Sequence, residues 1–185
     1  MSFRSFSQTI RTPDVKNYLS QQDHVKKYVT DMKKVTGARI IPTKTAKDAV
    51  VGSDIVVTTT MSTSPLVMAS WIGQGAHVTA MGSDSPEKQE LETGVLGKAD
   101  KIVVDSLTQC AKLGEVHHAL ADGTIVEKDV HGELGEVLLG KKPGRVSDDE
   151  ITVCDLTGLA VQDVMISQLV YRRALKKGIG SHIRV

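Results

Sequence analysis

The sequence predicts an α/β fold, in which helices cover both faces of a parallel sheet. Two observations carry this prediction. Short apolar runs that suit buried strands alternate along the 185 residues with stretches whose apolar residues recur at helical intervals. The repeated order of strand, helix and strand favours a parallel sheet, because parallel neighbours need a crossover connection that is usually a helix.

The first part of the chain is predicted to form three strands separated by two helices. Val15–Leu19 and Arg39–Pro42 are short apolar runs, and Asp54–Thr58 has the composition of a buried strand. Asp23–Val35 and Thr45–Val51 each place apolar residues on one side of a helix, and a glycine follows each closely.

Hydroxyl groups crowd the stretch that follows the third strand. Thr58–Pro65 lies where the chain must turn at the carboxyl end of that strand. Thr60 is a plausible ligand contact in this position. The alternative is that these hydroxyls only satisfy the backbone of the turn, and the two interpretations stay open on spacing alone.

A carboxylate follows the next predicted strand, which runs through Val78 and Ala80. Asp84 lies between Gly82 and Pro86, at the carboxyl end of this strand. In open α/β sheets this edge is where ligands bind. The alternative interpretation makes Asp84 the cap of a helix that begins near Pro86, with Glu87 and Glu90 in its first turn.

The remaining elements continue the alternation. We expect strands at Asp100–Asp105 and Ile151–Cys154, helices at Thr108–Leu113, Gly114–Ala121, Gly132–Leu139 and Leu159–Gly178, and a charged loop at Lys141–Glu150.

Composition excludes several classes of partner. The net charge is +1 and aromatic residues make up 3%, so we expect neither a nucleic-acid nor a membrane partner. Cys110 and Cys154 have no metal-binding or redox spacing, so we expect reduced, buried thiols and a cytoplasmic location. His117 and His118 are adjacent on a predicted helix and point about 100° apart, so they cannot face one metal ion, and we predict none.

Several motifs at predicted strand ends occur together, and in this combination the chain resembles the carboxyl-terminal part of the ornithine cyclodeaminase and mu-crystallin family. The resemblance runs from about Val15 to the end of the chain. Some motifs are most similar to ectoine-utilisation members, and the ending Gly180–Ile183 is similar to the archaeal alanine dehydrogenase branch. The motifs that carry the resemblance are Asp54–Thr60, Trp71, Gly75–Asp84, Lys88–Leu91, Ala99–Ser106, Glu133–Glu136, Gly140–Arg145, Ser147–Thr152, Asp155–Gly158 and Gln162–Asp163.

The resemblance implies a Rossmann-like sheet and an enzyme that uses NAD or NADP. Its substrate would be a small amino acid or imine, its reaction a cyclising deamination (a lyase reaction) or an amino-acid or imine oxidoreduction, and its full-length form a homodimer. The matching acid/base is Asp84, which must be ionised near neutral pH. Thr157 matches a substrate-facing position, and cofactor-lining positions match Thr60, Met61, Val78, Thr79, Ala80, Met81, Lys88 and Leu156. The mu-crystallin branch lacks this carboxylate, so the presence of Asp84 favours catalysis. The alternative is a non-catalytic NADP- or ligand-binding protein or an inactive remnant, which the missing phosphate loop supports.

The chain also departs from the family pattern. The first Rossmann strand, its GxGxxG loop and the amino-terminal dimerisation and substrate domain have no counterpart in the sequence. We therefore expect a fragment with weakened cofactor affinity that associates with itself. Residues 1–150 would form a partial NAD(P)-binding domain, and residues 151–185 a strand and helix that pack on the missing domain. No acidic side chain occurs at Leu19–Gln21, where the family reads the cofactor ribose, so NAD and NADP stay open.

Overall fold

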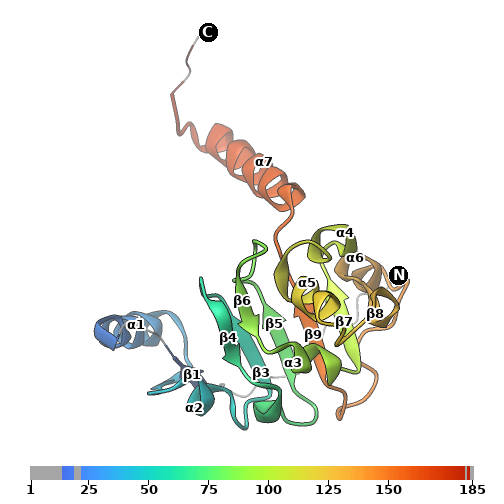
Figure 1. Cartoon of the computed structure of the whole chain (residues 1–185). Helices are drawn as coiled ribbons and strands as arrows, with labels where there is room; N and C mark the ends of the chain where they lie inside the picture. The colour runs from blue at the N-terminus through green and yellow to red at the C-terminus, as the bar shows by residue number, and fades with distance from the viewer. Residues whose placement is uncertain (1–13, 19–21, 182, 184–185) are drawn as a thin grey trace.

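A computed structural model of the chain describes residues 14–18, 22–181 and 183 (Figure 1). The positions at Leu19–Gln21 that would read the cofactor ribose lie outside the described residues. The side chains of residues 22–24 lie outside them too.

The centre of the molecule is a five-stranded parallel sheet with the strand order β3-β5-β9-β7-β8. Two further pairs of parallel strands, β1–β2 and β4–β6, lie beside it (Figure 1). The predicted α/β fold with a parallel sheet flanked by helices is therefore confirmed. The strands are β1 Asp14–Asn17, β2 Arg39–Pro42, β3 Ile55–Thr58, β4 Thr63–Val67, β5 His77–Ala80, β6 Gln89–Leu91, β7 Lys101–Val104, β8 Val130–Glu133 and β9 Thr152–Asp155.

Helices connect these strands and complete the core. The α-helices are α1 Gln22–Val35, α2 Ala46–Val50, α3 Thr93–Gly97, α4 Leu107–Cys110, α5 Gly114–Ala121, α6 Leu134–Leu138 and α7 Ala160–Lys177, and short 3-10 turns lie at Ala69–Trp71 and Glu127–Asp129. Val78 and Val104 on the sheet are fully buried, as are Val95 on α3 and Val116 on α5. Helices α3 and α5 therefore seal one face of the central strands, and burial of these side chains holds the two layers together.

The strand register aligns four strand ends in one row. Thr58 pairs with Ala80, Ala80 with Asp155, and Asp155 with Val104. Because all these strands are parallel, the segments that follow them meet at the same carboxyl edge of the sheet. Strand β9 lies between β5 and β7, so the strand at the start of the 151–185 segment is part of the central sheet, while the domain boundary at residue 150 stays a prediction.

Strands β1 and β3 each lie at an end of their sheet in the described part of the chain. β1 pairs only with β2, and β3 pairs only with β5. Ile55 and Val57 on β3 are 64% and 56% exposed. The doubly wound fold has the strand order 3-2-1-4-5-6. In that order, β2 and β1 of this chain match strands 3 and 2, on one side of strand 1, and β3 and β5 match strands 4 and 5, on its other side.

Three expected features are corrected. No helix begins near Pro86: the chain turns there and enters β6, so Glu90 lies in a strand and not in a first helical turn. The hydroxyl-rich turn at Thr58–Pro65 is shorter than expected, because β4 begins at Thr63 and pairs with β6. The helix expected from Gly132 begins at Leu134, because Gly132 lies in β8 and pairs with Val103.

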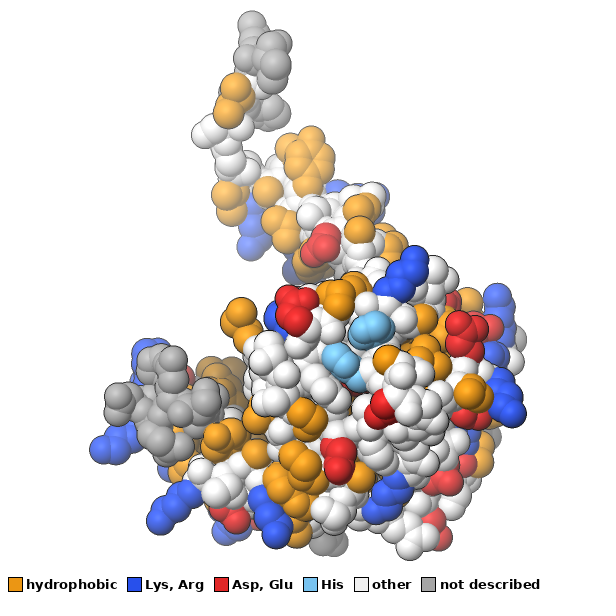
Figure 2. All heavy atoms as spheres, viewed as in Figure 1, with side chains coloured by type: hydrophobic (Ala, Val, Ile, Leu, Met, Phe, Trp, Pro, Cys, Tyr) orange, Lys and Arg blue, Asp and Glu red, His pale blue; other side chains and the backbone are white. Residues whose placement is uncertain are grey.

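Helix α7 extends away from the sheet (Figure 1). It ends at Gly178, whose φ of 64° is the left-handed conformation of a glycine cap, as predicted. Figure 2 shows apolar side chains on its surface, among charged and other atoms. Met165, Leu169 and Tyr171 of this helix are 62%, 43% and 64% exposed. Within the described part of the chain, no helix is both long and apolar enough to cross a membrane.

Candidate active site

Asp84 forms an ion pair on the loop that follows β5. Its Oδ1 lies 2.5 Å from the Nζ atom of Lys88, and its side chain is 55% exposed whereas that of Lys88 is 19% exposed. The hydrogen bond from Lys88 holds the pKa of Asp84 below its ordinary value. Asp84 is therefore an accessible, ionised carboxylate at neutral pH, which is the state that a proton acceptor requires.

The segments that follow β3 and β5 bring three exposed residues to the same edge. Thr60 and Met61 follow β3, and Met81 follows β5. Met61 and Met81 are 81% and 50% exposed, and the Thr60 hydroxyl accepts a hydrogen bond from the Ser62 amide at 3.2 Å. These three of the predicted cofactor-lining residues are accessible to a ligand from solvent.

Other predicted site residues are directed into the protein. The side chains of Val78 and Ala80 belong to the core, so only their backbone is placed to approach a cofactor. Thr79 is half-buried, and its Oγ1 lies 3.1 Å from Nε2 of His77. Leu156 is half-buried at the end of β9, and its amide donates to the Ala80 carbonyl at 2.9 Å.

Thr157, the predicted substrate contact, is buried and bonded within the protein. Its hydroxyl donates to Oδ1 of Asp105 at 3.2 Å and accepts a hydrogen bond from Gln109 at 2.9 Å. Asp105 also accepts from the Gly158 amide at 2.7 Å, so the carboxyl ends of β7 and β9 are tied together. The substrate role of Thr157 stays a prediction, and this geometry gives its hydroxyl a structural task as well.

Glu90 is an important residue of this edge that sequence reasoning placed wrongly. Its side chain is fully buried, and its carboxylate accepts hydrogen bonds from the backbone amides of Thr60 and of Gly82, the latter at 2.9 Å. These two amides lie on the loops after β3 and β5. A charged residue in a stretch with a proline and three other charges is expected at the protein surface. Only the strand character of Gln89–Leu91 could have indicated that Glu90 is buried.

Two further buried carboxyl groups lie behind Glu90. Glu115 on α5 accepts from the Glu90 and Leu91 amides at 2.7 and 3.1 Å, and Asp155 accepts from the Val116 amide at 2.9 Å. Burial raises the pKa of Glu115 to about 7 and that of Asp155 to about 8, and the charges of neighbouring carboxylates add to both shifts. Both groups therefore bind protons in the neutral pH range, which is unusual for carboxyl groups.

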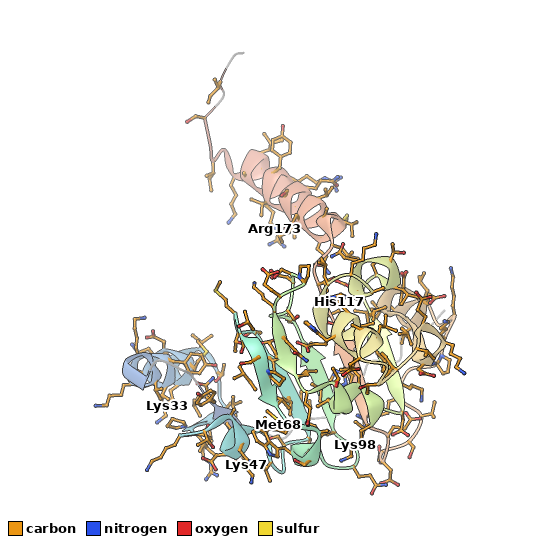
Figure 3. All side chains as sticks on the ribbon, in the orientation of Figure 1. Lys33, Lys47, Met68, Lys98, His117 and Arg173 are labelled. Atoms are coloured by element: carbon orange, nitrogen blue, oxygen red, sulfur yellow. The ribbon has the colours of Figure 1, made fainter. Side chains whose placement is uncertain are left out.

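The two histidines of α5 bind backbone oxygens and do not converge on one point. His118 Nε2 lies 2.7 Å from the Lys88 carbonyl oxygen, which fixes the loop that carries Lys88, and His117 Nδ1 lies 3.4 Å from that of Ala111. Figure 3 shows His117 at the end of the sheet from which α7 leaves, whereas Met68 and Lys98 lie at the opposite end. Over the described residues, no three His, Cys, Asp or Glu side chains are grouped as metal ligands.

Cys110 and Cys154 are both buried and unbonded to each other, as predicted. Burial raises the pKa of their thiols to about 12 and about 11, and nearby carboxylates contribute to the shift. They are therefore protonated at neutral pH and poor nucleophiles.

Comparison with known proteins gives a consistent result. The family model described as ornithine cyclodeaminase/mu-crystallin family matches residues 2–178. The alanine dehydrogenase of Archaeoglobus fulgidus is 44% identical over 172 residues, which cover 92% of this chain and 52% of that relative.

Two solved structures share the fold. An archaeal alanine dehydrogenase dimer with bound NAD has a TM-score of 0.86 at 44% identity, over 92% of this chain and 52% of that one. The Δ1-pyrroline-2-carboxylate reductase of Thermococcus litoralis, in complex with NADH and L-proline, has a TM-score of 0.87 at 31% identity, over 91% of this chain and 52% of that one. The chain thus spans about half the length of the relatives it matches.

Proposed function

Because the chain belongs to the ornithine cyclodeaminase/mu-crystallin family, we propose that its sheet edge is the nicotinamide-facing part of an NAD(P)-dependent active site. The substrate is a small amino acid or its imine. When bound, a nicotinamide cofactor supplies hydride transfer to or from the substrate carbon. Two relatives carry the names of an alanine dehydrogenase and a pyrroline-2-carboxylate reductase, which supports oxidoreduction over cyclising deamination.

The observation that carries this proposal is the placement of Asp84. Its carboxylate is exposed, ionised and held by Lys88 on the loop after β5, beside the exposed Met81 and the loop with Thr60 and Met61. A substrate amine in this position loses a proton when it is oxidised to an imine and gains one in the reverse direction. Asp84 is the group that takes up or returns this proton. Lys88 keeps it ionised between turnovers.

Turnover of the purified chain tests the proposal. NAD⁺ or NADP⁺ is mixed with L-alanine, L-proline or L-ornithine, and NADH or NADPH with pyruvate and ammonium, while reduced cofactor is followed by absorbance. Ammonium release is measured for L-ornithine as well, because a cyclising deamination returns the hydride and leaves no reduced cofactor. We expect Asp84→Asn to lower kcat by at least about a hundredfold, the usual scale of acid/base catalysis, with little change in cofactor binding.

The matched control is Asp148→Asn, because Asp148 is an exposed aspartate beside Gly75 at the opposite end of β5. It should keep the activity of the unaltered chain. Undiminished turnover of Asp84→Asn would refute the acid/base assignment, and an unaltered chain without turnover in either direction would refute catalysis by this chain.

A further inference from the structure

The starting point is the way in which Glu90 holds two loops at once. One carboxylate oxygen accepts from the Thr60 amide and the other from the Gly82 amide at 2.9 Å. The Cβ atom of any side chain at position 82 would clash with the Thr60 carbonyl oxygen and would lie 2.6 Å from the Glu90 carboxylate. The two loops therefore approach closely around a single buried carboxyl group, and only glycine at position 82 leaves room for this approach.

Glu90 is itself fixed from behind. Its own amide and that of Leu91 donate to the two carboxylate oxygens of Glu115 on α5. The Lys88 carbonyl, two residues earlier, is bound by His118 of the same helix at 2.7 Å. Helix α5 thus sets the position of β6, and β6 sets the position of the Glu90 carboxylate.

The anchored amides also fix the direction of the carbonyl oxygens in the same two peptides. The described peptides are trans, and in a planar trans peptide the N–H and C=O bonds point in opposite directions. Because the Thr60 and Gly82 amides point at Glu90, the carbonyl oxygens of Thr59 and Met81 point away from it. Both residues are exposed, and no described residue donates a hydrogen bond to either oxygen. Two acceptors from neighbouring strand ends are thus presented to solvent.

We propose that Glu90 is a positioning residue for the cofactor. By fixing the Thr59–Thr60 and Met81–Gly82 peptides, it holds the Thr59 and Met81 carbonyl oxygens where they receive the NH₂ group of the nicotinamide carboxamide. This assignment rests on the proposed function. The chemistry required is a primary carboxamide, because an NH₂ group supplies two donors whereas a carboxylate supplies none.

The test compares NAD⁺ with nicotinic acid adenine dinucleotide, which carries a carboxylate in place of the carboxamide. Binding is followed by the melting temperature of the chain, since a ligand of the folded state raises it. We expect the unaltered chain to prefer NAD⁺ by at least about tenfold, and Glu90→Gln to bring the two affinities within about twofold of each other. Glutamine directs an NH₂ group at one of the two amides, so one peptide loses its anchor.

The matched control is Leu91→Ala, because Leu91 is equally buried on the same strand and its side chain is apolar. This variant should lower the melting temperature through the cavity that it leaves, yet keep the preference for NAD⁺. A structural defect alone would weaken both dinucleotides equally. An unchanged preference in Glu90→Gln would overturn the positioning role while leaving the proposed function intact.

Amide hydrogen exchange of the free chain separates the two proposals. The Thr60 and Gly82 amides should exchange at least about tenfold faster in Glu90→Gln than in Leu91→Ala, after correction for global stability. If the unaltered chain binds neither dinucleotide, the proposed function fails and the carboxamide contact fails with it. Retained protection of both amides in Glu90→Gln would overturn the anchoring itself.

Discussion

Glu115 shows how a single residue couples the candidate site to pH. Its pKa is raised from an ordinary 4.5 to about 7, chiefly by burial, so the folded state binds a proton that the unfolded chain releases near pH 4.5. The stability that this protonation contributes is present at low pH and is lost as pH rises from about 4.5 through 7. Asp155 extends the same trend, because its pKa is raised to about 8.

We expect Glu115→Gln to remove the part of this pH dependence that Glu115 contributes. Relative to the variant, the unaltered chain should lose roughly 2–3 kcal/mol of unfolding free energy between pH 4.5 and 8, since one pKa unit corresponds to about 1.4 kcal/mol. Urea denaturation at a series of pH values measures this difference. Comparing the two proteins cancels the opposite trend of His77, whose pKa burial lowers.

The control for this experiment is Glu127→Gln, at an exposed glutamate on the 3-10 turn Glu127–Asp129. Its curve should run parallel to that of the unaltered chain. A Glu115→Gln curve that also runs parallel would show that Glu115 does not carry a raised pKa.

Among the elements, α7 carries many of the exposed large apolar side chains of the described structure. Val161, Met165 and Leu169 are spaced four residues apart on one side of the helix and are 58%, 62% and 43% exposed. A contiguous apolar face of this kind indicates an interaction surface. We therefore expect this face of α7 to mediate the self-association that the sequence predicts for this chain.

We predict that Met165→Gln with Leu169→Gln shifts the chain toward monomer in sedimentation velocity experiments, because it removes apolar area from the contact. The control pair is Lys176→Gln with Lys177→Gln, in the last turn of the same helix. It should leave the distribution unchanged. A monomeric unaltered chain at high micromolar concentration would contradict the prediction.

The elements also show where sequence patterns suffice and where they fail. Helix α5 and the end of α7 at Gly178 follow the prediction, because apolar spacing and glycine caps are local signals. β6 was missed because its three residues, Gln89–Leu91, are too few to display a period and follow a proline and several charges. Its burial depends on Glu115 and on the loops that Glu90 holds, which are distant in sequence.

The candidate site divides in the same way. Asp84 and Thr60 follow buried strands, and a parallel sheet necessarily brings such strand ends together. The roles of Glu90 and Glu115 could not be predicted, because a buried carboxylate is recognisable only through the backbone amides that it binds. Val78 and Ala80 match cofactor-lining positions, but the direction of their side chains into the core appears only in the fold.

For the whole molecule, we propose that the carboxyl edge of the β3-β5-β9-β7-β8 sheet binds a nicotinamide cofactor. The loops that would contact the cofactor follow four strand ends that lie in one row, at Thr58, Ala80, Asp155 and Val104. The chain covers about half of its relatives, and its sequence contains no glycine-rich phosphate loop, so the expected affinity is modest.

Titration of the purified chain with NADH and NADPH, followed by nicotinamide fluorescence and melting temperature, tests this claim most directly. We predict a saturable fluorescence change with a Kd between about 0.1 and 1 mM, or about −5.5 to −4 kcal/mol, and a parallel rise in melting temperature. No saturable change and no stabilisation at ligand concentrations well above 1 mM would contradict it.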